Sequence, residues 1–381
     1  MKRKKVLITT VQKAPNFGAS LQAYALWKYI SGLGHECKII DLLRPYHSGY
    51  IPTQGFEPFC KKERSWWLNF RIDYIRPLRK NVQNLFSHHN FDSQQNKLSA
   101  FSEKKFEAFD SQIAYTKTYA SIRELYNNPP QADLYITGSD QLWNPTQPYP
   151  LEPFFLTYVR KGLKISYATS VGVSKVSKYT KKKFSTWLKS YDAISVREPE
   201  AVSLLQPLVS QKISQCCDPT FLLPMRHWNN LASERQVEGK YIFLFIVGEG
   251  NQACDYAECL HKRLSLPVVT NKYIRGYNFQ IVNNIGPLEW LALIKDAEML
   301  VTNSFHGCVF SLIMNTPFRV SISNNRGSRI TNLLKQMGYE SLLLSKDNET
   351  MEIPTVDFEH TDKRINKLGE EGRNWLEQFL L

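Results

Sequence analysis

The chain has 381 residues, more than one ordinary hydrophobic core organises, so we expect two domains of roughly 150–200 residues each. Hydrophobic residues make up 43% of the sequence and aromatic residues 13%, which excludes an intrinsically disordered chain. The formal net charge of +13 suits anionic partners such as phosphorylated metabolites, nucleic acid or a membrane surface, although a solvated basic surface explains it equally well.

The cysteine pattern and the apolar runs bear on the cellular compartment. Seven cysteines are scattered without a recurring CxxC pair, which indicates free thiols in a reducing compartment and no structural zinc. No run of about 18 apolar residues occurs, so the sequence predicts no membrane-spanning helix. We therefore expect a cytoplasmic protein whose basic surface could touch the anionic inner leaflet of the cell membrane.

The first elements indicate a strand, a loop, a helix and a second strand. Residues 6–10 form an apolar run rich in β-branched side chains, residues 21–33 repeat apolar side chains at helical spacing, and residues 38–42 form the next strand. This order predicts a βαβ unit that opens a parallel sheet. The loop with Asn16 and Gly18 follows the first strand, at the edge where open α/β sheets bind ligands.

Residues 46–128 interrupt this alternation. They carry aromatic and basic helical patterns with few strand signals, and we interpret them as a helical insertion in the first domain. Alternation of strand and helix then resumes, and we place the end of the first domain, which covers 1–224, after CCDPTFLLP. The strands predicted in this part are 134–137, 164–168 and 193–196.

The second domain, 225–381, shows the same alternation. Its predicted strands are 241–247, 268–269, 299–302 and 318–322, and its helices include 251–264 and 287–295. An amphipathic C-terminal helix at 362–380 is expected to pack back on the first domain. The predicted fold class is α/β, with two Rossmann-like domains that face each other across a cleft.

The segment 297–318 combines an anion site with a proton donor. A strand leads into a turn with Ser304, His306 and Gly307, and an apolar helix follows over 308–314. A helix N-terminus presents unpaired N–H groups and partial positive charge to an anion, while a histidine carries a proton near neutral pH. Ser304 could equally act as a helix N-cap, which does not exclude ligand binding.

Arginines follow two other predicted strands. Arg197 ends the strand at 193–196 and should face the cleft, where its planar guanidinium suits a carboxylate or phosphate, although an ion pair with Glu198 is an equal alternative. Arg326 and Arg329 flank Gly327 in a loop after another strand. One of the two could reach the same anion, while the other caps a helix or pairs with a carboxylate.

Asp140, Gln141 and Trp143 occur together in GSDQLWNP, in another loop that follows a strand. An acid, an amide and an aromatic ring are the usual groups for holding a sugar. The alternative is a turn with a helix cap, for which Asp140 is well suited. Asp218, directly before Pro219, is interpreted as a turn former.

Several well-known motifs are missing from the sequence. No Walker motif, HExxH, GxSxG or GxGxxG occurs, which argues against a P-loop enzyme, a zinc protease, a hydrolase elbow and a typical dinucleotide enzyme. Other segments, taken together, resemble the polysaccharide pyruvyl transferase family, in the family's order and from about residue 5 to 345. They are NFGASLQAYALWKYISGLGHECKIIDL, DLYITGSDQLWNP, ISYATSVG, SVRE followed by DPTFLL, and LVTNSFHGCVFSLIMNTPF.

The resemblance implies a GT-B-like fold and transfer of pyruvate from phosphoenolpyruvate onto two hydroxyls of a saccharide, which gives a cyclic ketal and releases phosphate. Phosphoenolpyruvate would be a co-substrate, with no other cofactor and no metal. The residues implied in donor binding, with His306 also catalytic, are Arg197, Ser304, His306, Gly307 and Arg326. The residues expected at the acceptor, with Asp140 as the base, are Asn16, Gly18, Asp140, Gln141 and Trp143.

Two alternatives share the predicted fold. One is a glycosyltransferase that uses a nucleotide-sugar donor, and the other is a saccharide-binding protein without catalysis. A nucleic-acid binder is disfavoured because the basic residues are dispersed and no nucleic-acid module is recognisable. The expected acceptor is a saccharide precursor that could be linked to a lipid.

Overall fold

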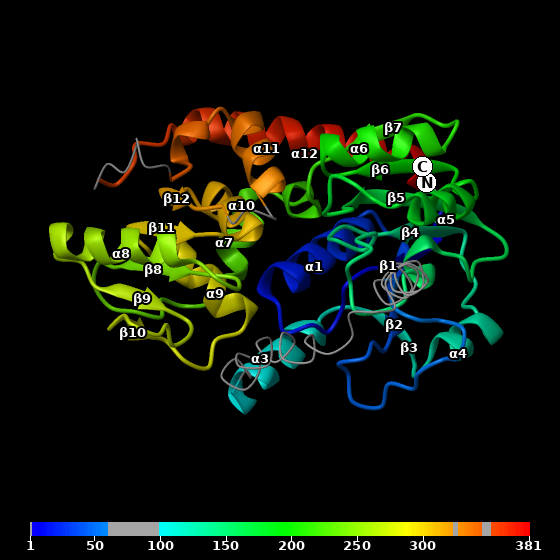
Figure 1. Ribbon diagram of the computed structural model, residues 1–381, viewed down its shortest axis with the longest axis horizontal. Helices are drawn as coiled ribbons and strands as arrows, with labels where there is room; N and C mark the ends of the chain where they lie inside the picture. The colour runs from blue at the N-terminus through cyan, green and yellow to red at the C-terminus, as the bar shows by residue number, and fades with distance from the viewer. Residues whose placement is uncertain (1, 60–98, 323–326, 345–351) are drawn as a thin grey trace, which may run out of the picture.

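The computed structural model describes residues 2–59, 99–322, 327–344 and 352–381. Over these residues the chain forms two parallel β-sheets that follow each other in sequence, with helices packed around them (Figure 1). The α/β fold class is therefore confirmed, and each sheet is built from one half of the chain.

The first sheet has seven strands in the order β3-β2-β1-β4-β5-β6-β7. Its strands are β1 (Lys5–Thr9), β2 (Glu36–Leu42), β3 (Tyr115–Tyr119), β4 (Leu134–Thr137), β5 (Leu163–Thr169), β6 (Ala193–Val196) and β7 (Ile213–Gln215). The chain runs outward in both directions from the adjacent pair of β1 and β4. The carboxyl ends of these two strands therefore form the crevice where open α/β sheets bind ligands.

The second sheet has five strands in the order β10-β9-β8-β11-β12. Its strands are β8 (Ile242–Phe245), β9 (Val268–Thr270), β10 (Gln280–Ile281), β11 (Met299–Thr302) and β12 (Phe318–Val320). Here the reversal of strand order lies between β8 and β11, so the loops after these two strands line the corresponding crevice.

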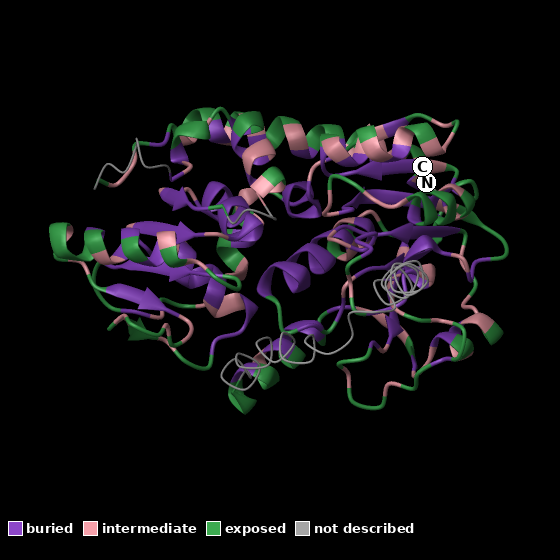
Figure 2. Ribbon diagram, viewed as in Figure 1, coloured by how far each residue is buried: buried purple, intermediate pink, exposed green. Residues whose placement is uncertain are grey.

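Most helices combine buried and exposed residues, whereas the helix Phe305–Ile313 is buried along its whole length (Figure 2). The helices are α1 (Phe17–Gly32), α3 (Ala100–Asp110), α4 (Ile122–Asn127), α5 (Lys178–Leu188), α6 (Pro199–Leu205), α7 (Met225–Leu231), α8 (Asn251–Leu264), α9 (Pro287–Lys295), α10 (Phe305–Ile313), α11 (Gly327–Met337) and α12 (Phe358–Leu380). A short 3-10 helix, η3 (Pro219–Leu222), follows β7.

The part of 46–128 that the structure describes differs from the predicted helical insertion. It contains α3 and α4, but between them β3 pairs with β2 and forms the edge of the first sheet. Tyr115–Tyr119 is a polar sequence, YTKTY, with only its last residue buried, so no apolar alternation marked it as a strand. Residues 60–98 lie outside the described residues.

Helix α12 crosses from the second half of the chain to the first (Figure 1). It packs on η3, and its Arg373 donates to the backbone carbonyl of Leu222 at 3.2 Å. Near its end the ring of Trp375 lies 6.0 Å from that of Tyr167 on β5. A helix that contacts both halves in this way restrains their relative position. None of the helices in the described ranges is long and apolar enough to cross a membrane.

Candidate functional site

His306 lies in the first turn of α10, directly after β11. The helix begins at Phe305, earlier than the sequence predicted, because Ser304 acts as its N-cap and accepts a hydrogen bond from the Gly307 N–H at 3.2 Å. The Gly307 N–H is therefore already satisfied, which corrects the expectation that it would serve an anion. Gly307 is required by packing, since a Cβ there would stand 2.7 Å from the Thr302 hydroxyl oxygen.

The ring of His306 contacts the N-terminus of α1, the helix that follows β1 of the first sheet. A Cβ on Gly18 would stand 2.2 Å from His306 Nδ1, so only glycine allows this approach. The predicted residues Gly18 and His306 therefore come together in space, from the first turns of the helices that follow β1 and β11. Asn16 caps α1 by accepting from the Ala19 N–H at 3.1 Å.

A buried carboxylate joins the two halves of the site. Asp218, which precedes η3, accepts a hydrogen bond from Arg197 Nη1 at 2.6 Å. The same oxygen, Oδ2, lies 3.5 Å from His306 Nε2. Asp218 is 1% exposed, Arg197 6% and His306 8%. A guanidinium and an imidazole, which follow strands of different sheets, thus converge on one carboxylate that water hardly reaches.

The charges of this cluster depend on one another. Burial alone would raise the pKa of Asp218, but the neighbouring His306 and the charge of Arg197 hold it below its ordinary value. Burial likewise opposes the charged form of Arg197, yet the carboxylates of Glu198, Asp218 and Asp140 raise its pKa above the usual value. Asp218 is therefore ionised at neutral pH, and the guanidinium is charged.

Some polar atoms of this cluster are left unpaired. Arg197 Nη2, His306 Nε2 and Glu198 Oε2 are buried and have no hydrogen-bond partner within the described residues. Buried polar atoms are usually paired, so unpaired ones require an explanation. The two nitrogens belong to side chains that both contact Asp218, and they could both bind one anionic ligand.

Phe305 and Arg329 complete the wall next to Arg197. The guanidinium carbon of Arg197 lies 4.4 Å from the centre of the Phe305 ring, and that of Arg329 lies 5.8 Å from it. With its amide oxygen turned toward Arg329, Gln141 accepts from the two guanidinium nitrogens at 3.1 and 2.6 Å. Gln141 and Arg329 thus bridge the two halves of the chain. Arg326 lies outside the described residues.

The predicted acceptor residues fall in different places. Asp140 adopts a φ of 76°, accepts from the Gln141 N–H at 2.8 Å, and lies close enough to Arg197 for its charge to act there. Trp143, in contrast, is 0% exposed, stacks on Phe155 and donates its ring N–H to the Phe154 carbonyl at 2.9 Å. A ring enclosed in the core cannot stack on a sugar, which corrects that expectation.

Sequence reasoning missed the role of Asp218. It does act as a turn former, because its side chain accepts from the Thr220 N–H at 3.1 Å. Its other oxygen pairs with Arg197, which precedes it by 21 positions. The one available signal was position, since Asp218 follows β7 at the same sheet edge where Arg197 follows β6. In the described ranges no three His, Cys, Asp or Glu side chains gather so as to hold a metal ion.

Two sheets whose crevices face each other, with a site between them, define the GT-B class of folds. Solved structures of this class are similar over the whole chain. MnaA of S. aureus, solved with UDP, is 12% identical, with 99% of this chain and 97% of that chain covered and a TM-score of 0.51. The UDP-GlcNAc 2-epimerase of Methanocaldococcus jannaschii is 10% identical, with 98% and 99% covered and a TM-score of 0.47.

Comparison of the sequence with family profiles assigns the chain to one family, which is narrower than the GT-B class of folds. The profile of the family described as Polysaccharide pyruvyl transferase matches residues 16–326, and the chain belongs to that family of transferases. A comparison with curated proteins found no significant match. The matched range includes Gly18, Arg197, Asp218 and His306.

Proposed function

We propose that this protein transfers the pyruvyl group of phosphoenolpyruvate to two hydroxyls of a saccharide, forming a cyclic ketal and releasing phosphate. Family membership supports pyruvyl transfer in general. The observation that carries the proposal is the convergence of Arg197 and His306 on Asp218, each with a buried nitrogen unpaired within the described residues. Such a pair suits a small ligand with more than one negative charge.

The chemistry of phosphoenolpyruvate assigns one role to Arg197 and another to His306. Phosphoenolpyruvate carries a carboxylate and a phosphate on one carbon of its double bond, and Arg197 would hold one of these anions. His306 would deliver a proton to the methylene carbon, which leaves an oxocarbenium-like centre for a sugar hydroxyl to attack. Since Nδ1 faces Gly18, the proton would be transferred from Nε2. Asp218, whose Oδ2 lies 3.5 Å from Nε2, would hold the imidazole ring in position.

The second half of the reaction closes the ketal. The phosphate leaves with its bridging oxygen, and the second sugar hydroxyl bonds to the same carbon. Of the two hydroxyl protons, one replaces the proton delivered to the methylene carbon and the other protonates the departing phosphate. We propose Asp140 as the base, because it follows β4 at the crevice and its charge acts at Arg197. This reaction would need no metal and no cofactor other than the donor.

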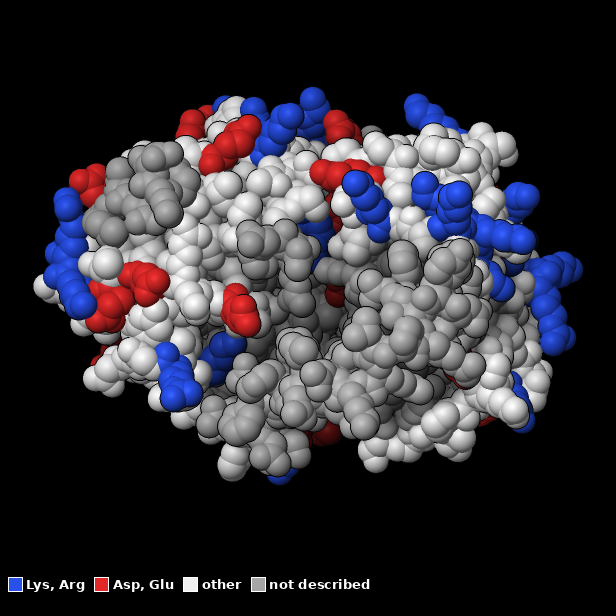
Figure 3. Space-filling model, viewed as in Figure 1, with Lys and Arg blue, Asp and Glu red and all other residues white. Residues whose placement is uncertain are grey.

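We further propose that the protein works at the inner face of the cell membrane on a saccharide that is lipid-linked. Exposed lysines lie on α5 and just before and after it, namely Lys175, Lys178, Lys181, Lys182, Lys183 and Lys189. Figure 3, drawn in the same view as Figure 1, shows basic side chains gathered at the right of the molecule, where α5 lies in Figure 1. Anionic lipids attract such a surface by about 1 kcal/mol for each lysine or arginine near the membrane.

The donor is identified by comparing ligands and products. Phosphoenolpyruvate should raise the thermal unfolding midpoint of the protein, whereas UDP should not. Incubation with phosphoenolpyruvate and a panel of aryl or lipid-linked glycosides should release phosphate and give a product heavier by one pyruvyl ketal. Stabilisation by UDP alone, with no phosphate released from phosphoenolpyruvate, would instead indicate a nucleotide-sugar enzyme.

A further inference from the structure

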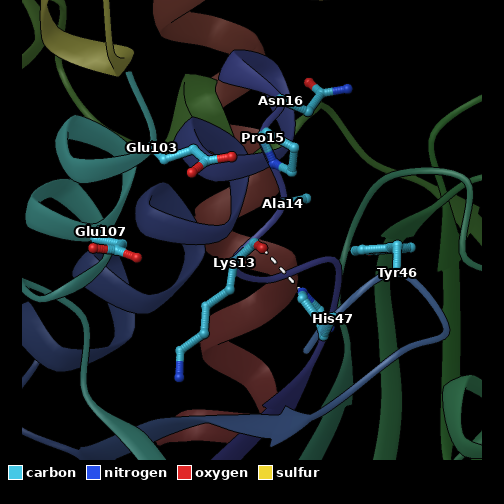
Figure 4. Close-up of a pocket in the computed structure, with 8 residues that line it drawn as sticks. All are labelled: Lys13, Ala14, Pro15, Asn16, Tyr46, His47, Glu103 and Glu107. Carbon is cyan, nitrogen blue, oxygen red and sulfur yellow. Dashed lines mark hydrogen bonds between the residues drawn. The ribbon is translucent and has the colours of Figure 1, made fainter. Parts of the chain in front are cut away.

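We infer that a pocket beside α3 is the subsite that holds the acceptor's sugar ring, and that it selects an uncharged ring over an anionic one. The inference rests on the proposed pyruvyl transfer. The cavity has a volume of about 510 Å³ and opens between α3, the loop after β1 and the loop after β2 (Figure 4). Its lining residues are Lys13, Ala14, Pro15, Asn16, Tyr46, His47, Glu103 and Glu107.

The pocket adjoins the reacting centre through a short stretch of chain. Asn16 lines the cavity, and Gly18, two residues later, touches the ring of His306. Consecutive Cα atoms are about 3.8 Å apart, so the Cα atoms of Asn16 and Gly18 are at most about 8 Å apart. Asp140 is close enough to both regions for its charge to act on Arg197 and on Tyr46.

One wall of the pocket is formed by two loops joined through His47. Its Nδ1 accepts from the Arg44 N–H at 2.9 Å, so Nε2 carries the hydrogen and donates to the Lys13 carbonyl at 3.0 Å. Burial lowers the pKa of His47, which keeps the ring neutral in this arrangement. Lys13 itself adopts a φ of 47°, which turns its carbonyl into this bond. The wall is therefore already formed without a ligand.

Tyr46 supplies an aromatic surface in the pocket. The residue is 50% exposed, which is unusual for so large a ring. The guanidinium of Arg44, itself 2% exposed, lies 5.0 Å from the ring centre and fixes its position. An exposed ring held in place from behind suits contact with the apolar face of a sugar.

The opposite wall carries negative charge. Glu103 and Glu107 are one turn apart on α3 and therefore share a face of the helix (Figure 4). Both are exposed, and neither side chain has a hydrogen-bond or ion-pair partner within the described residues. Lys13 does not balance them, because its ammonium pairs with Asp41 at 2.6 Å. Carboxylates accept hydrogen bonds from sugar hydroxyls and repel an anion, so the pocket favours an uncharged ring.

Steady-state kinetics and binding together test this subsite. We expect Tyr46→Ala and the double variant Glu103→Gln/Glu107→Gln to raise the KM for an uncharged aryl hexopyranoside by about tenfold or more, a loss of about 1.4 kcal/mol. The KM for phosphoenolpyruvate should stay unchanged. In the double variant an aryl glucuronide should become a better acceptor relative to the uncharged glycoside. Calorimetric titration with the uncharged glycoside alone should show weaker binding in both variants.

A matched control and separate outcomes keep the two proposals apart. Glu370→Gln removes an exposed carboxylate on α12, away from the pocket, and should leave both KM values unchanged. If the wild type turns over but the pocket variants keep the acceptor KM and the glycoside affinity, the subsite is wrong while the function stands. If the wild type releases no phosphate with any glycoside, yet the variants lose glycoside binding, the function is wrong while the sugar pocket stands.

Discussion

Gly18 lies so close to His306 that a β-carbon at position 18 would stand 2.2 Å from Nδ1 of the ring. The two residues lie on helices that follow strands of different sheets and are 288 positions apart, so the contact fixes the histidine only while the two halves of the chain are packed together. The geometry of the proposed proton donor therefore depends on a glycine in the other half of the molecule.

Replacing Gly18 with alanine should displace the imidazole and lower kcat by about tenfold to a hundredfold, since small misplacements of a catalytic group are costly. Gly32 is the matched control, because it lies in the same helix and a Cβ there meets nothing within 4 Å. Gly32→Ala should leave kcat unchanged. Equal rates for wild type and Gly18→Ala would show that the position of the ring does not matter for turnover.

Asp218→Asn should weaken both stability and the active form of the site. The substitution leaves buried Arg197 without its closest carboxylate, and breaking a buried ion pair costs about 3–5 kcal/mol. It also removes the carboxylate oxygen that lies 3.5 Å from His306 Nε2, so the ring should be held less firmly and kcat of the folded fraction should fall. Chemical denaturation and kcat of the folded fraction measure the two effects.

The two readouts for Asp218 separate a structural role from a positioning role. A purely structural residue would lower the free energy of unfolding without changing kcat of the folded fraction. An unchanged kcat in Asp218→Asn, measured where the variant remains folded, would remove Asp218 from the proposed mechanism.

Asp110 should make stability depend on pH near neutrality. Burial raises its pKa from 3.8 to about 7, with the charge of Asp41 adding to the effect and that of Lys13 opposing it. The folded protein therefore keeps this proton over a range of pH in which the unfolded chain has lost it. The stabilisation is complete below about pH 4 and is lost as the pH rises to about 7.

The variant Asp110→Asn lacks this dependence. Its free energy of unfolding should therefore gain on that of the wild type between pH 5 and pH 8, by at most roughly 3 kcal/mol. Urea denaturation at both pH values measures the difference, and Glu370→Gln, an exposed carboxylate, should show none. A constant difference between wild type and Asp110→Asn would mean that Asp110 titrates like an exposed acid.

The lysines of α5 should mediate binding to anionic vesicles. The protein should sediment with phosphatidylglycerol vesicles at low salt but not with phosphatidylcholine vesicles, and binding should fall as salt screens the charges. The triple variant Lys181→Glu, Lys182→Glu and Lys183→Glu should abolish sedimentation. The same charge change elsewhere, in Lys262→Glu, Lys363→Glu and Lys367→Glu, should retain most of it, and equal loss in both variants would refute a specific membrane face.

The apolar strands of both sheets could be predicted because burial on two faces imposes a continuous hydrophobic run. The strands at 134–137, 193–196 and 299–302 have the predicted bounds. Arg197 and His306 could be predicted as site residues for a related reason, since side chains just after parallel strands gather at one edge of a sheet. Predicting them required only local sequence and the general rule for where α/β sheets bind ligands.

Other parts of the site depend on contacts that no local pattern contains. Asp218 looks like a turn residue, and only the fold brings it to Arg197 and His306. Trp143 has the composition of a sugar site, yet the packing of Phe155 encloses its ring. The early start of α10 follows from the Ser304 cap, which the sequence allowed but did not distinguish from an anion site.

The most direct test of the account is phosphate release from phosphoenolpyruvate that depends on an added saccharide. The wild type should release phosphate only with an accepted glycoside, in equal amount to the ketal product detected by mass. His306→Ala should remain folded and lose activity by about 10²–10⁴-fold. Near-normal turnover in His306→Ala, or release of phosphate without any saccharide product, would contradict it.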